Sequence, residues 1–143
     1  MKVLYTATAI ATGEGRNGHV QSVDGHLDTA VRMPKELGGE GGATNPEQLF
    51  AAGYAACFHE ALRYAAAQAK ADTTGSQVAA DVSIGRLPGG GFGLSVRLHV
   101  HLPALGQETA EALARQADKV CPYSNATRGN IEVTLTVTGP RQG

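Results

Sequence analysis

The sequence predicts an α+β fold with mainly antiparallel sheets, a long central helix and a second helix. Segments that alternate apolar and polar residues, as strands do, flank two segments with helical periodicity. Their order of strands, helix, two strands, helix and strand indicates the α+β class. The 143 residues contain no internal repeat and no linker, and this length suits about one domain. We therefore expect a single domain over residues 1–143.

The first third of the chain predicts an antiparallel meander. Residues 3–12, VLYTATAIAT, alternate as a strand, and a glycine-bearing turn at 13–18 leads into residues 19–33. The pair Asp24-Gly25 is a hairpin signal within that stretch. Residues 34–45 carry too little apolar surface for a helix or strand, so we expect a long loop, a kind of segment that often carries function.

A long helix is predicted from Pro46 to about residue 70. Asn45 is a good N-cap, Pro46 suits the first helical position, and Glu47 lies in the first turn. Gly53 and many alanines would let another backbone approach closely, so we expect this helix to be buried on more than one side. Its apolar stripe consists of Phe50, Tyr54, Cys57, Phe58, Ala61 and Ala65.

The second half of the chain continues the alternation of strands and helices. We expect a strand pair at 77–85 and 92–102, an amphipathic helix at 107–120 and a final strand at 131–139. Between the last two elements, residues 122–129, PYSNATRG, predict a short helical turn that stops at Gly129.

The charge balance and the N-terminus exclude several classes of protein. Twelve basic and 13 acidic residues leave no electrostatic footprint for nucleic acid or an anionic membrane, so we expect neither as a partner. The first residues carry one lysine and many threonines, which fits neither a signal peptide nor a spanning helix. We expect a cytoplasmic protein, in which two cysteines are more often catalytic or metal-binding than a permanent disulfide.

Two patterns resemble ligand sites but lack the context that such sites need. Residues 13–18, GEGRNG, match the dinucleotide-binding glycine pattern, yet the residues that follow predict a strand where the pattern needs a helix. His99 and His101 share one face of a strand and could bind a metal, but no third ligand has zinc-site spacing. We favour solvated histidines over a metal site.

The two cysteines are the remaining candidates for chemistry. Cys57 lies in mid-helix, where no free N–H groups can stabilise a thiolate. It could equally be a small buried hydrophobic residue or a reactive thiol that a cation from elsewhere in the structure activates. Cys121 precedes Pro122 near the start of the short helical turn, close to unpaired amides. The pair is too widely spaced for a CxxC motif, but the two thiols could meet in space as a reacting and a resolving thiol.

Several stretches resemble the organic hydroperoxide resistance (Ohr) branch of the Ohr/OsmC family over essentially the whole chain. They are TNPEQLF, AAGYAACFHEAL, IGRLPGGGFGL, VCPYSNATRGNI and the glycine-rich loop at residues 36–42. The resemblance implies an intertwined α+β homodimer that reduces organic hydroperoxides, including those of fatty acids, to alcohols. It also implies dihydrolipoyl groups on lipoylated proteins as the external reductant, with no bound cofactor or metal.

The resemblance assigns roles to four residues. Cys57 corresponds to the peroxidatic cysteine, which becomes a sulfenic acid, and Cys121 to the resolving cysteine, which closes a disulfide with it. Arg16 corresponds to the arginine that activates the thiolate, and Glu47 to the carboxylate that orients this arginine. From the residues alone, Arg16 is an ordinary turn arginine and Glu47 a carboxylate that suits a helix dipole.

The organic group of the hydroperoxide needs apolar surface near the cysteines. The aromatic residues near the motifs are Phe50, Tyr54, Phe92 and Tyr123, and core packing is the default for each. Of these, we expect Phe50 and Phe92 as pocket walls. Two other classes of function use the same cysteines: a non-catalytic thiol redox sensor, and a module that binds metal through a cysteine and histidines. The sensor would need an output surface or an effector domain, and this short chain offers none.

Residue spacing favours a shared site independently of the family resemblance. Ten residues separate Glu47 from Cys57, which is about 15 Å along a straight helix. Arg16 can therefore hardly contact both residues, so either the helix bends sharply or Arg16 and Glu47 reach Cys57 from a second copy of the chain. We expect a homodimer with two composite sites, each joining the cysteines of one chain to Arg16 and Glu47 of the other.

Overall fold

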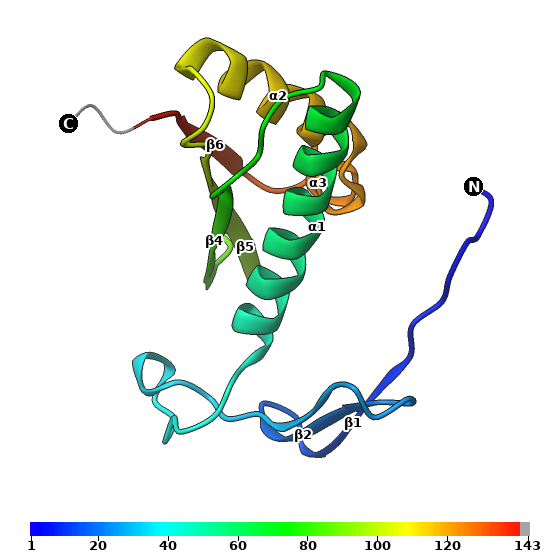
Figure 1. Ribbon diagram of the computed structural model, residues 1–143. Helices are drawn as coiled ribbons and strands as arrows, with labels where there is room; N and C mark the ends of the chain where they lie inside the picture. Colours follow the sequence, from blue (N-terminus) through cyan, green and yellow to red (C-terminus); the bar gives the residue numbers. More distant parts are fainter. Residues whose placement is uncertain (141–143) are drawn as a thin grey trace. The chain divides into compact units, whose positions relative to one another are not determined.

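Figure 1 shows the computed structural model of the chain, which describes residues 1–140. The chain forms two compact units, Met1–Leu49 and Phe50–Gly143. Within residues 1–140, two three-stranded sheets and three α-helices confirm the predicted α+β class with mainly antiparallel strands. A single domain over residues 1–143 stays a prediction, and residues 141–143 lie outside the described residues. No helix in the described part of the chain is long and apolar enough to cross a membrane.

The first unit contains an antiparallel sheet in the order β1–β2–β3. Its elements are β1 (Ala9–Glu14), β2 (Asn17–Ser22), β3 (Asp28–Ala30) and a 3-10 helix, η1 (Lys35–Leu37), within the expected loop. The predicted meander is confirmed, but its first strand begins at Ala9 and not at residue 3. The reason is pairing: Ala9 lies opposite Ser22, where β2 ends, so the preceding residues have no strand beside them.

A two-residue hairpin turn places Arg16 at one end of this sheet. Glu14 pairs with Asn17 in the ladder, so Gly15 and Arg16 alone form the turn. Gly15 has a φ of 65°, a left-handed conformation that glycine adopts without the strain that other residues meet. The GEGRNG stretch therefore builds a tight hairpin, which agrees with the rejection of a nucleotide site.

The second unit packs helices on one face of a mixed sheet. Its elements are α1 (Pro46–Gln68), which begins in the first unit, β4 (Gln77–Arg86), β5 (Phe92–His101), α2 (Gln107–Val120), α3 (Pro122–Thr127) and β6 (Val133–Thr138). The sheet order is β4–β5–β6, with β4 antiparallel and β6 parallel to β5. A parallel pair needs a crossover connection, which α2 and α3 supply. Figure 1 shows the helices gathered beside this sheet.

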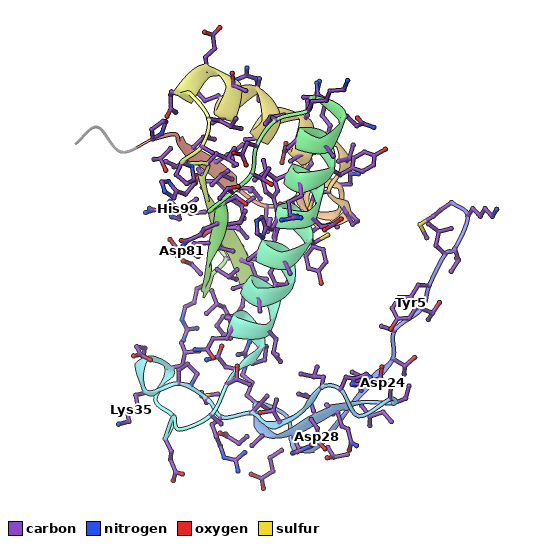
Figure 2. All side chains as sticks on the ribbon, in the orientation of Figure 1. Tyr5, Asp24, Asp28, Lys35, Asp81 and His99 are labelled. Atoms are coloured by element: carbon purple, nitrogen blue, oxygen red, sulfur yellow. The ribbon has the colours of Figure 1, made fainter. Side chains whose placement is uncertain are left out.

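The core of the second unit lies between these helices and the inner face of the sheet. Its largest buried side chains are Tyr54, Phe58 and Leu62 of α1 together with Val96, Leu98, Val100 and Leu102 at β5. The outer face of the sheet is polar, and Figure 2 shows Asp81 and His99 next to each other on it. His99 Nε2 lies 2.9 Å from Asp81 Oδ2, and His101 bonds Thr138. Among residues 1–140, no group of three or more potential metal ligands comes together.

Both ends of α1 follow local rules. Asn45 Oδ1 accepts a hydrogen bond from the Gln48 N–H at 2.9 Å, which confirms the predicted N-cap. At the other end the Ala71 N–H donates to the Ala66 carbonyl, and Lys70 takes the left-handed conformation usually filled by glycine, with a φ of 54°. One chain buries a single face of the helix, so burial on further sides stays a prediction.

Candidate active site

The two cysteines face each other between α1 and α3. Cys57 lies in the middle of α1 and is half-buried, whereas Cys121 is fully buried and precedes α3. Their sulfur atoms are 3.8 Å apart, and the Cys121 thiol points toward Cys57 as a hydrogen-bond donor. Because a disulfide bond is about 2.05 Å long, the sulfurs have to approach by less than 2 Å to bond.

Pro122 explains the position of Cys121. The helix α2 ends at Val120, and Cys121 has an extended backbone, with φ −65° and ψ 120°, before α3 begins. A residue that precedes proline is disfavoured in the helical conformation, so the break falls at this cysteine. Proline also lacks an N–H group, which makes the Tyr123 amide the first donor at the start of α3.

The environment of Cys57 in one chain does not favour a thiolate. Burial raises the pKa of Cys57 above its ordinary value of 9.0, the Tyr123 N–H opposes this by a hydrogen bond, and the nearby Cys121 raises the pKa further. The sequence places the free amides beside Cys121, and one of them, the Tyr123 N–H, thus acts on the pKa of Cys57. A further cation is needed to bring this pKa down to the neutral range.

Arg16 and Glu47 form a two-pronged ion pair in the first unit. Arg16 Nη1 donates to Glu47 Oε2 at 2.8 Å, and Nη2 donates to Oε1 at 2.7 Å. The hydrogen bonds to Arg16 lower the pKa of Glu47 below its ordinary 4.5, and Glu47 in turn raises the pKa of Arg16. Both groups are therefore charged at neutral pH, and the planar guanidinium is held in one orientation.

Phe50 and Tyr54, which lie two turns and one turn before Cys57 on α1, form an aromatic group with Tyr123 of α3. The ring centre of Tyr123 lies 6.1 Å from that of Phe50 and 5.6 Å from that of Tyr54. Phe50 and Cys57 are seven residues apart on α1, so they share a face of the helix. The Tyr123 ring rests on Gly53, where an added Cβ would lie 2.7 Å from the tyrosine hydroxyl oxygen.

Phe92 lies elsewhere in the second unit, at the end of β5 next to the β4–β5 turn. The residue is 64% exposed, and the Arg86 guanidinium carbon lies 5.6 Å from the centre of its ring. The structure thus places Phe50, but not Phe92, in the aromatic group beside Cys57. The roles of Phe50 and Phe92 as pocket walls both stay predictions.

The sequence reasoning missed the polar role of Tyr54. Its position in the apolar stripe is confirmed, since its side chain is fully buried. Its hydroxyl, however, bonds Ser124 at 2.9 Å and Thr127 at 3.1 Å. A signal for this was present, because a tyrosine in a buried stripe requires a partner for its hydroxyl group.

Comparison with known proteins gives a consistent family. Residues 39–136 match the family described as OsmC-like protein. An organic hydroperoxide resistance protein of Xanthomonas axonopodis pv. citri is 54% identical over 138 residues, which cover 95% of this chain and 96% of the relative. The organic hydroperoxide resistance protein OhrB of Bacillus subtilis is 46% identical over 135 residues, covering 92% and 96%.

A solved structure supports the same conclusion. The crystal structure of an organic hydroperoxide resistance protein from Elizabethkingia anophelis, described with thiocyanate bound, superposes with a TM-score of 0.93. The two sequences are 55% identical, and the alignment covers 97% of this chain and 99% of that one. The chain therefore belongs to the OsmC-like family and, within it, to the organic hydroperoxide resistance proteins.

Proposed function

We propose that the protein is a cysteine-based peroxidase that reduces organic hydroperoxides, including those of fatty acids, to alcohols. The observation that carries this proposal is the pair of free thiols 3.8 Å apart, one half-buried and one fully buried. This is the arrangement that a thiol needs to react with a peroxide and then be resolved by a neighbour. Close relatives named for organic hydroperoxide resistance support the substrate class.

The first step is attack of the Cys57 thiolate on the terminal oxygen of the hydroperoxide. A sulfur–oxygen bond forms, the O–O bond breaks, and the alkoxide leaves and takes up a proton to become the alcohol. The sulfur loses two electrons and becomes a sulfenic acid. Cys121 then attacks the Cys57 sulfur, a disulfide forms, and the sulfenic oxygen leaves as water with the Cys121 proton.

Arg16 is the cation that we propose for activating Cys57. A guanidinium remains charged at any relevant pH, and in a partly dry site it would lower the pKa of the thiol and stabilise the departing alkoxide. The ion pair with Glu47 supports this role, because it fixes the plane of the guanidinium. Arg16 would then offer its charge from a fixed direction.

We further propose that each site combines two subunits of a homodimer. Ten residues of helix, about 15 Å, separate the position of Glu47 from that of Cys57, which argues against a site within one chain. The first unit also buries very little: within residues 1–49, Val31 and Asn45 are the buried residues, whereas Val3, Leu4 and Ile10 are exposed. A three-stranded sheet without an apolar partner is only marginally stable, which favours association.

The disulfide needs an external reductant to complete the cycle. We propose dihydrolipoyl groups, free or carried by a lipoylated protein, and no bound cofactor or metal. A dithiol of this kind reduces the disulfide by two successive thiol exchanges and leaves as its own cyclic disulfide.

The test of the function is turnover of cumene hydroperoxide with dihydrolipoamide as the electron donor, compared with hydrogen peroxide. We expect repeated turnover and a preference for the organic peroxide. Cys57→Ser should abolish the reaction, whereas Cys121→Ser should permit one oxidation and then stall or over-oxidise, as mass spectrometry would show. Wild-type activity in the Cys57→Ser protein would rule out the proposal, and a single oxidation without turnover would indicate a sensor.

The shared site has its own test. Cys57→Ser protein and Arg16→Ala protein, each inactive, are refolded together and the mixture is assayed. A heterodimer should regain about one intact site of two, because each chain supplies the part that its partner lacks. If the chains exchange and no activity returns, the four residues act within one chain.

A further inference from the structure

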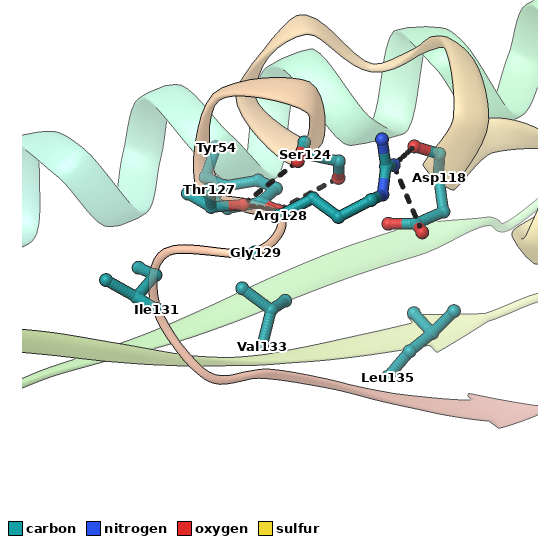
Figure 3. Close-up of a pocket in the computed structure, with 9 residues that line it drawn as sticks. All are labelled: Tyr54, Asp118, Ser124, Thr127, Arg128, Gly129, Ile131, Val133 and Leu135. Atoms are coloured by element: carbon teal, nitrogen blue, oxygen red, sulfur yellow. Dashed lines mark hydrogen bonds and ion pairs between the residues drawn. The ribbon is translucent and has the colours of Figure 1, made fainter.

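Three buried hydroxyl groups connect the two helices that flank the cysteine pair. Tyr54 of α1 meets Ser124 and Thr127 of α3, as Figure 3 shows. The three side chains, here called the hydroxyl cluster, belong to residues that are 0%, 2% and 6% exposed. The three residues thus have almost no exposed surface, and a hydrogen bond lost within the cluster leaves a buried polar group without its partner.

The hydrogen bonds of the cluster have one consistent direction. The Thr127 hydroxyl donates to the Ser124 backbone carbonyl at 3.2 Å, so its oxygen is left to accept a proton from Tyr54. With its only proton used, the Tyr54 oxygen accepts from the Ser124 hydroxyl at 2.9 Å. Each hydroxyl then donates once, and removing any one of them leaves a buried partner without its bond.

The cluster lies one helical turn from each sulfur atom. Tyr54 precedes Cys57 by three residues on α1, and Ser124 follows Cys121 by three residues. A displacement of α3 along α1 would therefore change the distance between the two sulfurs directly.

The packing around α3 leaves it room to move, so the hydrogen bonds of the hydroxyl cluster matter for holding it in place. A hollow of about 210 Å³ lies beside α3, and all three residues of the cluster line it together with Ile131 and Val133 (Figure 3). Because this space contains no side chain, apolar contact does not block a movement of α3 toward it. Hydrogen bonds to Tyr54, together with the contacts of the Tyr123 ring, restrain that movement instead.

We propose that the hydroxyl cluster is a positioning device for disulfide formation, an inference that rests on the proposed peroxidase function. It holds Cys121 at 3.8 Å from Cys57, so that resolution is faster than a second oxidation. The Cys57 sulfenic acid has two competing fates. Attack by Cys121 gives the disulfide and water, whereas reaction with a second hydroperoxide breaks another O–O bond and gives a sulfinic acid and an alcohol.

The test measures how oxidised protein divides between disulfide and sulfinic acid. Tyr54→Phe removes one hydroxyl group and keeps the ring, and Tyr64→Phe makes the same change at an exposed tyrosine of the same helix. Both proteins are treated with increasing cumene hydroperoxide without reductant and examined by mass spectrometry. We expect the ratio of sulfinic acid to disulfide to rise about fivefold to tenfold in Tyr54→Phe, the effect of one lost buried hydrogen bond.

Further measurements separate positioning from general damage. The rate of the first oxidation, followed by loss of the Cys57 thiol, should be the same in Tyr54→Phe, Tyr64→Phe and wild type. Thr127→Ser keeps the hydroxyl group and should behave as wild type, whereas Thr127→Val keeps the shape and should over-oxidise. This second pair decides the question if Tyr54→Phe does not fold.

Two outcomes have different meanings. The positioning role is wrong if wild type forms the Cys57–Cys121 disulfide and both Tyr54→Phe and Thr127→Val give the same ratio of sulfinic acid to disulfide as wild type. If wild-type protein forms no such disulfide with peroxide, the proposed function itself fails, and the positioning role fails with it.

Discussion

Gly53→Ala sets two effects of similar size against each other. Replacing glycine by alanine inside a helix stabilises it by about 1 kcal/mol through backbone propensity. The new Cβ would, however, lie 2.7 Å from the Tyr123 hydroxyl oxygen and 3.2 Å from its ring carbon Cζ. To restore ordinary contact at 3.4 Å, the hydroxyl oxygen has to retreat by about 0.7 Å.

The ring can retreat, because Tyr123 is 38% exposed. The retreat weakens its edge contacts with Phe50 and Tyr54, and overpacking of this kind costs about 1–3 kcal/mol. We therefore expect the free energy of unfolding to change little or to fall by up to about 2 kcal/mol. The pKa of Cys57 should stay the same, since the Tyr123 N–H that opposes its rise belongs to the backbone and stays in place when the ring alone retreats.

A double-mutant cycle with Tyr123→Phe tests this reasoning. Phenylalanine lacks the hydroxyl oxygen that lies nearest the new Cβ, so Gly53→Ala should become stabilising by about 1 kcal/mol in that background. Urea unfolding gives the stability of the four proteins, and alkylation of Cys57 against pH gives its pKa. If Gly53→Ala has the same effect on stability with and without the hydroxyl group, the contact with Tyr123 does not limit this position.

Two further predictions concern the ion pair and the end of α1. Arg16 lowers the pKa of Glu47, so between this lowered value and the ordinary 4.5 the folded state binds fewer protons than the unfolded state. The stability that the pair contributes is thus present above pH 4.5 and lost as the pH falls through the lowered pKa. The difference between the free energies of unfolding of wild type and Glu47→Gln should therefore shrink as the pH falls through this range. A difference that stays constant would contradict the assignment. Lys70→Gly should raise the free energy of unfolding by about 0.5–1 kcal/mol, because glycine relieves the left-handed strain at φ 54°, and a loss of stability in urea unfolding would show that the lysine side chain matters there.

Features that depend on neighbouring residues in the chain could be predicted from the sequence. Asn45 and Pro46 gave the start of α1 correctly, and Pro122 gave the break at Cys121. The alternation of β5 also placed His99 on the polar face of its sheet. In each case the controlling interaction lies within a few residues.

Features that depend on distant partners could not be predicted in this way. The strand pattern at residues 3–8 is as good as that of β1, but β2 ends before reaching them. The parallel pairing of β6 with β5 depends on the crossover through α2 and α3. Likewise, nothing near Cys57 in the chain indicates that the Tyr123 N–H acts on its pKa or that Cys121 donates to its sulfur.

In the proposed reaction cycle, the unequal burial of the two cysteines would determine which sulfur a reductant can reach. In a disulfide formed with little movement, Cys121 would stay fully buried and Cys57 half-buried. An incoming dithiol would then attack the Cys57 sulfur, and the mixed disulfide would form on Cys57 with Cys121 as the leaving thiol. The same opening would thus admit the oxidant and the reductant in turn, so peroxide and dithiol would compete for access to one sulfur atom.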